Sequence, residues 1–209
     1  MPHAKNGLFI TFEGGEGAGK TSQINQVGDW LRKRGLEVVT TREPGGTPVA
    51  DRIRKTLLDS KEPISPETEL FLYETARRDH VAAVIRPALR RGAIVLCDRF
   101  TDATIAYQAY GRGLSLKVVS AMNEIATGGL KPTLTFLLDL PAETGLQRAR
   151  KRKRGLDRLE KEAKTFHEKV RAGYLTLARK DKKRIRKIDA ARSRDKIFSD
   201  IRRELEKIL

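Results

Sequence analysis

A glycine-rich segment near the start of the chain carries residues that can act on a phosphate. Its pattern, Gly14-x-x-x-x-Gly19-Lys20-Thr21, has the spacing of a P-loop, in which glycines let the backbone aim N–H groups at phosphate oxygens. Lys20 is expected to reach the β- and γ-phosphates, and the Thr21 hydroxyl to bind Mg²⁺. The segment is predicted to bind ATP with Gly14, Gly15, Glu16, Gly17, Ala18, Gly19, Lys20 and Thr21.

A second charged pair, Asp98-Arg99, directly follows the apolar run Ala93–Cys97. An arginine at the carboxyl end of a parallel strand points into the crevice where open α/β sheets bind ligands. A hydrolase needs a water there, whereas a kinase needs a second anion site, which Arg99 suits. The alternative is a mutual surface ion pair. The chain has no Asn-Lys-x-Asp motif and no apolar run ending in Asp-Glu, which argues against a GTPase and many hydrolytic ATPases.

Short apolar runs and helix-length segments alternate along the chain, and these elements must position the two sites. Continuous apolar runs separated by helices favour a parallel sheet covered on both faces. The sequence therefore predicts one α/β domain over residues 1–209, with about five strands. The expected strands are Leu8–Phe12, Val38–Thr41, Ala93–Cys97, Leu134–Leu138 and Ile185–Ile188.

Proline and glycine mark several helix boundaries. Pro48 suits the first turn of a helix through Leu58. A second helix is expected from the Ser65 cap to about Arg91, with a kink or break at Pro87. Pro141 opens a helix that is predicted to continue as far as Arg154.

The net charge of +16 is unevenly distributed. Residues 141–209 hold 24 Lys and Arg against 11 Asp and Glu, which suits a nucleic-acid surface, a lid over phosphates, or a solvated exterior. The single cysteine, Cys97, rules out an internal disulfide framework and favours a reducing cytoplasm. No stretch approaches the length of an apolar membrane helix, and the N-terminus has no secretory pattern.

Several motifs together resemble the thymidylate kinase family, from about Leu8 to Ala190. They are FEGGEGAGKT, TREPGGTPVADRIR, RRDHV, DRFTDATIAYQAYGRGL, RGLDRLE and KIDA. The P-loop is shared with many enzymes, but REPGGT combined with DRF…AYQ…GRGL is much more specific. The resemblance implies transfer of a phosphoryl group from ATP to dTMP in dTTP synthesis, a P-loop fold with strand order 2-3-1-4-5, and a homodimer.

The resemblance also implies roles for single residues. Arg77 and Arg99 would bind the acceptor phosphate, since guanidinium groups fit phosphate in a bidentate manner. Tyr73 resembles the residue that stacks on thymine, with core packing as the alternative. Thr104 and Gln108 would face the base or sugar, Tyr107 would crowd the ribose 2′ position, and Glu43 and Pro44 would shape the loop over the acceptor.

The roles of two carboxylates remain open. The resemblance implies that Glu16 lies close to the reacting phosphates and sugar, where a carboxylate needs Mg²⁺, the substrate 3′-hydroxyl or a guanidinium as partner. Asp98 is expected either to orient Mg²⁺ through water or to position Arg99.

Some members of the family carry a basic residue in the P-loop, and others, typically bacterial, deliver an arginine from a lid. This P-loop contains no arginine, so the resemblance implies that the catalytic positive charge comes from a lid at about residues 147–160. Arg154 is the predicted catalytic arginine alongside Lys20, Arg99 and Glu16, with Arg158 second. Arg148 is expected along the adenine or phosphates of ATP. In a loop resembling the adenine-contacting segment of the family, Ala190 and Arg192 would lie nearest the adenine.

Two other functions compete with this interpretation. A P-loop kinase for UMP, CMP or AMP would share the phosphate chemistry but not the set of residues around the base. A nucleic-acid-stimulated ATPase would use the basic last third of the chain and bind DNA with steep salt dependence. The arginines of that third are not interleaved with stacking aromatics, which argues against the ATPase.

Overall fold

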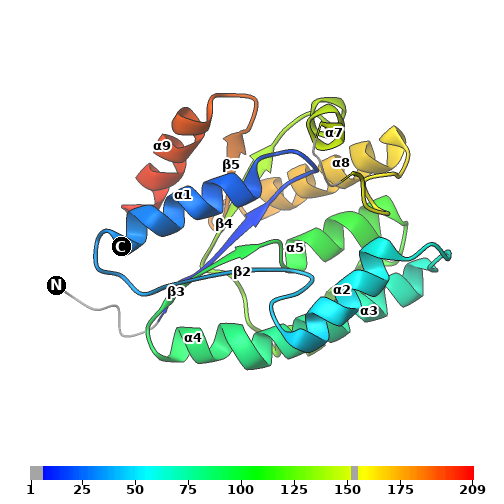
Figure 1. The fold of residues 1–209 in the computed structure, drawn as a ribbon, viewed down its shortest axis with the longest axis horizontal. Coiled ribbons are helices and arrows are strands. Elements are labelled where there is room, and N and C mark those ends of the chain that lie inside the picture. Colours follow the sequence, from blue (N-terminus) through cyan, green and yellow to red (C-terminus); the bar gives the residue numbers. More distant parts are fainter. Residues whose placement is uncertain (1–6, 152–154) are drawn as a thin grey trace.

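The computed structural model describes residues 7–151 and 155–209. Five parallel strands form one sheet in the order β2-β3-β1-β4-β5, which confirms the predicted fold class and strand order (Figure 1). The strands are β1 Phe9–Glu13, β2 Val38–Arg42, β3 Ile94–Asp98, β4 Leu134–Asp139 and β5 Ile185–Asp189.

Each strand ends one residue later than its apolar run predicted. The extra residues are polar or charged: Glu13, Arg42, Asp98, Asp139 and Asp189. A run of apolar residues marks only the part of a strand that is covered by helices, whereas the backbone ladder continues to the edge of the sheet. The carboxyl edge of the sheet is therefore lined with ionisable groups, as expected for the ligand-binding side of an α/β fold.

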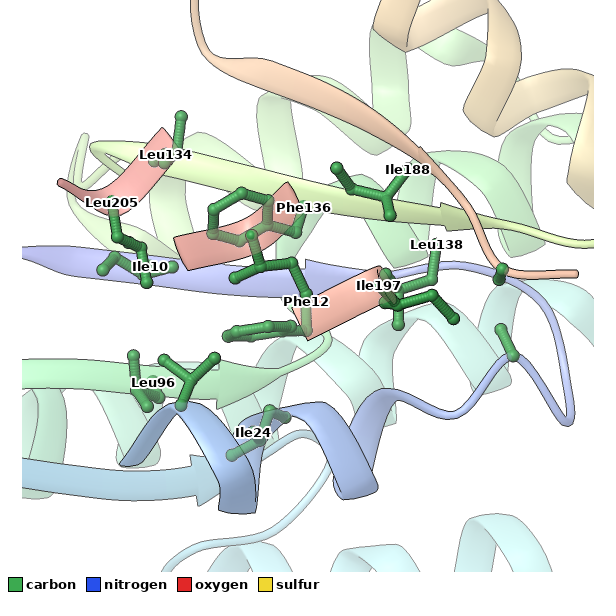
Figure 2. Close-up of a cluster of buried hydrophobic side chains, with 14 of the residues drawn as sticks. Ile10, Phe12, Ile24, Leu96, Leu134, Phe136, Leu138, Ile188, Ile197 and Leu205 are labelled. Atoms are coloured by element: carbon green, nitrogen blue, oxygen red, sulfur yellow. The ribbon is translucent and has the colours of Figure 1, made fainter. Parts of the chain in front are cut away.

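Two helices, α1 (Lys20–Arg32) and α9 (Arg194–Leu205), cover one face of the sheet. Figure 2 shows the core between them, where Ile10, Phe12 and Phe136 meet Ile24 and Ile197. Ile10, Phe12 and Phe136 have no exposed surface, and burial of such a side chain stabilises the fold by about 1.5–3 kcal/mol. This core anchors the strand and helix that flank the P-loop.

The remaining helices pack mainly on the other face or above the carboxyl edge. There the buried cluster includes Phe9, Val95 and Cys97, while β4 and β5 pack against the helix that carries Val170 and Tyr174. The helices are α2 Pro48–Asp59, α3 Pro66–His80, α4 Arg86–Arg90, α5 Thr101–Thr104, α6 Leu116–Thr127, α7 Ala142–Arg150 and α8 Lys164–Lys180, with π-helical turns η1 Val81–Ile85 and η2 Ile105–Gly111.

The helix expected from Ser65 to about Arg91 has the predicted extent, since α3 passes through η1 into α4, which ends at Arg90. Of the two outcomes expected at Pro87, a kink or a break, the break does not occur, and the Arg86 N–H donates to Val81 O across the π-helical turn. This widened turn accommodates a proline, which has no N–H and crowds the preceding turn. The helix after Pro141 ends at Arg150, and residues 155–157 are not helical, so it does not continue into the RGLDRLE segment.

Within the described residues, no helix is both long and apolar enough to cross a membrane.

Candidate active site

The P-loop connects β1 to α1 and is folded around its own lysine. Lys20 is 8% exposed, and its Nζ donates to Gly14 O and Gly15 O, each at 3.1 Å. Burial, followed by the charge of Arg99, lowers the Lys20 pKa. Gly14 has a φ of 136°, and a Cβ there would lie 2.4 Å from Leu138 O, so this position requires glycine.

Helix α7 packs directly on this loop. A Cβ on Gly17 would fall 2.2 Å from Gly145 O and 3.0 Å from the Cβ of Arg148. Arg148 in turn donates from Nη1 to Ala190 O at 3.2 Å. Arg148 thus joins the P-loop to the segment after β5 that was predicted to lie near adenine, although neither Arg148 nor Arg192 lines the central cavity. Arg192 forms an ion pair with Asp200.

A cavity of about 510 Å³ opens beside the P-loop and contains most of the predicted site. Two further arginines, Arg42 and Arg54, line it without having been predicted. Arg42 is the first residue of the REPGGT motif, and its place next to Glu43 and Pro44 could have identified it as a site residue. Arg54 donates to Pro44 O at 2.8 Å. The predicted residues in its wall are Glu16, Gly17, Ala18, Gly19, Lys20, Thr21, Glu43, Pro44, Tyr73, Arg77, Asp98, Arg99, Thr104, Tyr107 and Gln108.

Arg99 projects into this cavity from a strained backbone. Its φ is 70°, a left-handed conformation that costs a non-glycine residue about 1 kcal/mol or more. The turn is held because the Arg99 N–H donates to Phe12 O at 3.0 Å and the Phe100 N–H donates to the Glu13 carboxylate at 2.7 Å. The guanidinium lies 4.8 Å from the centre of the Tyr107 ring, and its Nη1 donates to Tyr174 Oη at 3.1 Å.

Glu16 has the guanidinium partner that was one of its three predicted options. Its Oε1 accepts from Arg99 Nη2 at 2.6 Å and from the Tyr107 hydroxyl at 2.7 Å. Burial alone would raise the Glu16 pKa, but the charges of Arg99 and Lys20 outweigh it and lower the pKa to about 2. Glu16 therefore stays ionised and holds Arg99 over the P-loop.

Glu13, which was not predicted as a site residue, lies directly behind this arrangement. It is completely buried, and its second carboxylate oxygen accepts from the Tyr174 hydroxyl at 2.8 Å. Burial and the nearby charge of Asp102 raise its pKa to about 8, against the opposing influence of Arg99. No spacing rule indicates such a role, because Glu13 meets Tyr174 only through the tertiary fold.

The raised pKa of Glu13 predicts a pH-dependent stability that Glu13→Gln removes. Between its ordinary pKa of 4.5 and about 8, the folded chain keeps a proton that the unfolded chain has released. The free energy of unfolding therefore falls as the pH rises through this window. Its slope corresponds to a difference of up to one bound proton between the folded and unfolded states. Denaturant titrations of both proteins at about pH 6 and about pH 8 measure the difference. Equal pH dependence in the two proteins would contradict the prediction.

Asp98 turns toward Thr21 rather than toward Arg99. The Thr21 hydroxyl donates to Asp98 Oδ2 at 2.9 Å, at the mouth of the cavity. Hydroxyl and carboxylate oxygens are ligands that suit Mg²⁺, which often takes few protein ligands and keeps several waters. In the described part of the chain, no group of three or more His, Cys, Asp or Glu could form a metal cage.

Arg77 is placed differently from Arg99, although both line the cavity. It is 2% exposed, with Nε donating to Glu43 Oε2 at 2.7 Å and Nη1 to Glu74 Oε1 at 2.6 Å. Further bonds reach Thr104 Oγ1, Asn123 Oδ1 and Phe100 O. These bonds use the guanidinium mainly to join α3 to the elements around it, so Arg99 is much better placed than Arg77 to meet a phosphate.

The loop after β2 is tied to the same network. Glu43 accepts from Arg77, and its other oxygen lies 3.0 Å from His80 Nδ1. The peptide bond between Glu43 and Pro44 is cis. Both Glu43 oxygens are engaged by the protein, so this residue shapes the loop through its buried contacts, while Pro44 forms part of the cavity wall.

The residues predicted to meet a base also line this cavity. Tyr73 comes from α3, while Thr104, Tyr107 and Gln108 come from the segment formed by α5 and η2. Tyr73 also packs against the buried cluster that contains Tyr107 and Phe166. Gln108 donates from Nε2 to Glu69 Oε1 at 2.9 Å.

Of the two candidates for the catalytic lid arginine, the structure describes one, Arg158. Arg154 lies outside the described residues. Arg158, the second candidate, donates from Nε to Leu57 O at 2.8 Å and from Nη2 to the Glu69 carboxylate. It therefore anchors the segment after Gly155 to α2 and α3. Asp157 and Leu159 of that segment line the cavity.

A P-loop and an arginine-bearing cavity at the carboxyl edge of a parallel sheet define a phosphotransferase of the P-loop class. The family model described as thymidylate kinase matches residues 12–201. A thymidylate kinase of Gloeobacter violaceus is 50% identical over 203 residues, which cover 97% of this chain and 96% of that protein. One from Geotalea daltonii is 52% identical over 196 residues, covering 90% and 92% respectively.

Similarity extends to a solved structure. The crystal structure of thymidylate kinase from Ehrlichia chaffeensis has a TM-score of 0.78 and 30% identity, and the match covers 96% of this chain and 98% of that one. The chain belongs to the thymidylate kinase family.

Proposed function

We propose that the enzyme transfers the γ-phosphoryl group of ATP from the P-loop to dTMP held in the adjoining cavity, giving dTDP and ADP. Membership of the family supports the reaction. The observation that carries the proposed geometry is one continuous cavity, lined by Lys20 and Thr21 of the P-loop and also by Tyr73 and Gln108. A nucleotide placed with its phosphate toward Arg99 and its base toward Tyr73 uses both groups of residues.

The positive groups perform the main catalytic work in this arrangement. Phosphoryl transfer spreads charge over the equatorial oxygens, so catalysis consists largely of positioning and electrostatic stabilisation. Lys20 exchanges its bonds to Gly14 O and Gly15 O for donor phosphate oxygens. Arg99 holds the acceptor phosphate, with Glu16 and Tyr107 fixing its direction. The lid segment adds a further arginine, which we assign to Arg154, and excludes water.

Magnesium fits the mouth of the cavity, where Thr21 and Asp98 would hold it directly or through water. When bound, the ion neutralises charge on the phosphates. Arg148 and Arg192 are proposed along the ATP side, where Arg148 already bridges the P-loop and Ala190.

Tyr73 is expected to bind the base by stacking, so Tyr73→Leu should raise KM for dTMP about tenfold with little change in kcat. Steady-state kinetics at saturating MgATP measures both. Tyr110→Leu is the matched control, because Tyr110 packs on Gly173 outside the cavity. If Tyr73 is only a core residue, the melting temperature falls while KM for dTMP stays near the wild-type value.

We also propose a homodimer formed through α3 and α6. These helices pack together, and their outer surfaces expose Phe71 at 59%, Val118 at 51% and Ile125 at 77%. Val118 and Ile125 are seven residues apart and so share one face of α6. A cytoplasmic location is proposed as well, and the single buried Cys97 suits a reducing compartment.

Ile125→Asp should convert the dimer to a monomer, since a charge at the centre of an apolar interface is costly. Sedimentation velocity measures the mass. Ile208→Asp is the control, because Ile208 is exposed at the C-terminus and lies on neither helix. A wild-type monomer, or an unchanged dimer of Ile125→Asp, would contradict the assignment.

The direct test of the function is ADP formation from MgATP with dTMP, dUMP, UMP, CMP, AMP or no acceptor. Strong dTMP-dependent turnover with little background is expected. Preference for another monophosphate would retain the kinase chemistry and overturn the assignment of the base-binding residues. Acceptor-independent hydrolysis stimulated by DNA would favour the nucleic-acid-dependent ATPase instead.

A further inference from the structure

Glu69 on α3 is a buried carboxylate that joins Gln108 in the cavity wall to Arg158 in the segment after Gly155. It has no exposed surface and accepts from three side chains. Arg112 donates to both of its oxygens, at 3.1 and 3.0 Å, while Arg158 donates to Oε2 and Gln108 to Oε1. Burial would raise the Glu69 pKa, but these hydrogen bonds lower it, so Glu69 is ionised and can only accept.

The charge of Glu69 determines which end of the Gln108 amide faces the cavity. An acceptor-only oxygen can be met by the amide NH₂ group but not by the amide oxygen. Gln108 Nε2 is therefore directed at Glu69, 2.9 Å away. Among the described residues, the buried side-chain polar atoms without a partner are Gln23 Oε1, Glu74 Oε2 and His167 Nε2. Gln108 Oε1 accepts no hydrogen bond from the described chain, yet it is not one of these buried atoms. It therefore keeps some exposed surface, which we place in the cavity that Gln108 lines.

The geometry points to Glu69 as a specificity-determining residue: by holding the Gln108 amino group, it leaves Gln108 Oε1 to accept a hydrogen bond from the substrate base. This favours a pyrimidine with an N3–H group, such as thymine or uracil. Cytosine, whose N3 is itself an acceptor, meets a second acceptor and loses a hydrogen bond. The inference rests on the proposed placement of the base between Tyr73 and Gln108. Glu69 itself acts only through Gln108, as a positioning residue.

The hydrogen bonds that Arg112, Arg158 and Gln108 donate to Glu69 also predict what an uncharged side chain does at position 69. In Glu69→Gln, the amide oxygen is attracted to the Oε2 position, where two guanidinium groups donate through Arg158 Nη2 and Arg112 Nη2, whereas the Oε1 position has one guanidinium donor, Arg112 Nε. The new amino group then occupies the Oε1 position and faces Gln108, and Arg112 Nε loses its hydrogen bond. Gln108 must turn its own oxygen toward position 69, and its amino group toward the cavity. The variant therefore presents a donor where the wild type presents an acceptor.

The test compares kcat/KM for dTMP and dCMP in the wild type and in Glu69→Gln. We expect the ratio of dTMP to dCMP to fall by about tenfold or more in the variant, the cost of one mismatched hydrogen bond. Arg112→Gln is the matched control, because it removes a charged partner of Glu69 but leaves the Glu69 carboxylate facing Gln108. The ratio of kcat/KM for dTMP to kcat/KM for dCMP in this variant should match the wild-type ratio. Equal loss for both substrates in Glu69→Gln would overturn the inference by showing a structural role only.

Two further measurements keep the test decisive. If Glu69→Gln does not fold, the double variant Glu69→Gln/Arg112→Gln removes the uncompensated positive charge and should show the same change in ratio. The rise in melting temperature with dTMP and with dCMP gives a readout without turnover. The larger rise with dTMP should shrink relative to that with dCMP in Glu69→Gln, as the ratio of kcat/KM does. A wild type with no dTMP-dependent turnover would refute the proposed function, whereas a selective wild type with an unchanged variant ratio refutes only the role of Glu69.

Discussion

We expect the replacement of Arg99 by alanine to lower kcat/KM for dTMP by about 10³-fold, the range seen when a charge-stabilising donor is removed from a reacting centre. Arg99 is the guanidinium held over the P-loop by Glu16 and Tyr107, and the cavity opens in front of it. The loss should appear in both kcat and KM for dTMP, because Arg99 is proposed both to bind the acceptor and to stabilise the transition state. KM for ATP should change much less.

Two comparisons show whether this loss is specific. Arg99→Lys keeps the charge but not the bidentate geometry, so it should recover only part of the activity. Arg186→Ala removes an arginine that pairs with Glu204 far from the cavity and should retain activity. Circular dichroism melting checks that Arg99→Ala is folded. A folded variant with less than about a tenfold loss would remove Arg99 from the reaction.

Lys20→Met should abolish turnover without weakening the fold. We expect kcat to fall about 10³-fold, because Lys20 is the P-loop lysine proposed to bring its positive charge to the β- and γ-phosphates. Methionine has a similar length, and the ammonium that it replaces is buried with a lowered pKa. Burying an ammonium is costly, so the melting temperature should stay the same or rise.

The control for Lys20 is Lys33→Met, which removes an exposed lysine just beyond the end of α1. It should leave both kcat and the melting temperature unchanged. A strongly destabilised Lys20→Met would show that the lysine holds the loop through Gly14 O and Gly15 O, and its low activity would then be uninformative about phosphate binding. Normal turnover in a folded variant would contradict the mechanism.

Local pattern was sufficient for the sheet and the P-loop. The five apolar runs identified all five strands, because a buried parallel strand is apolar on both faces. The Gly14–Thr21 spacing predicts a backbone conformation directly, since glycine tolerates the positive φ angles found at Gly14, Gly17 and Gly19. The exact strand ends and the π-helical turn before Pro87 were missed, because neither the backbone ladder nor that turn leaves an apolar signature.

By itself, the sequence determined the P-loop and the ionisable pair Asp98-Arg99 that follows a buried strand. Only the tertiary structure decided their partners. Glu16 meets Arg99 across 83 positions, Glu13 meets Tyr174 across 161, and Glu69 joins Gln108 to Arg158. Spacing encodes neighbours along one helix or strand, whereas contacts between elements depend on how they pack. For that reason the sequence did not reveal that Arg77, which lines the cavity together with Arg99, also has its guanidinium buried among Glu43, Glu74 and Asn123.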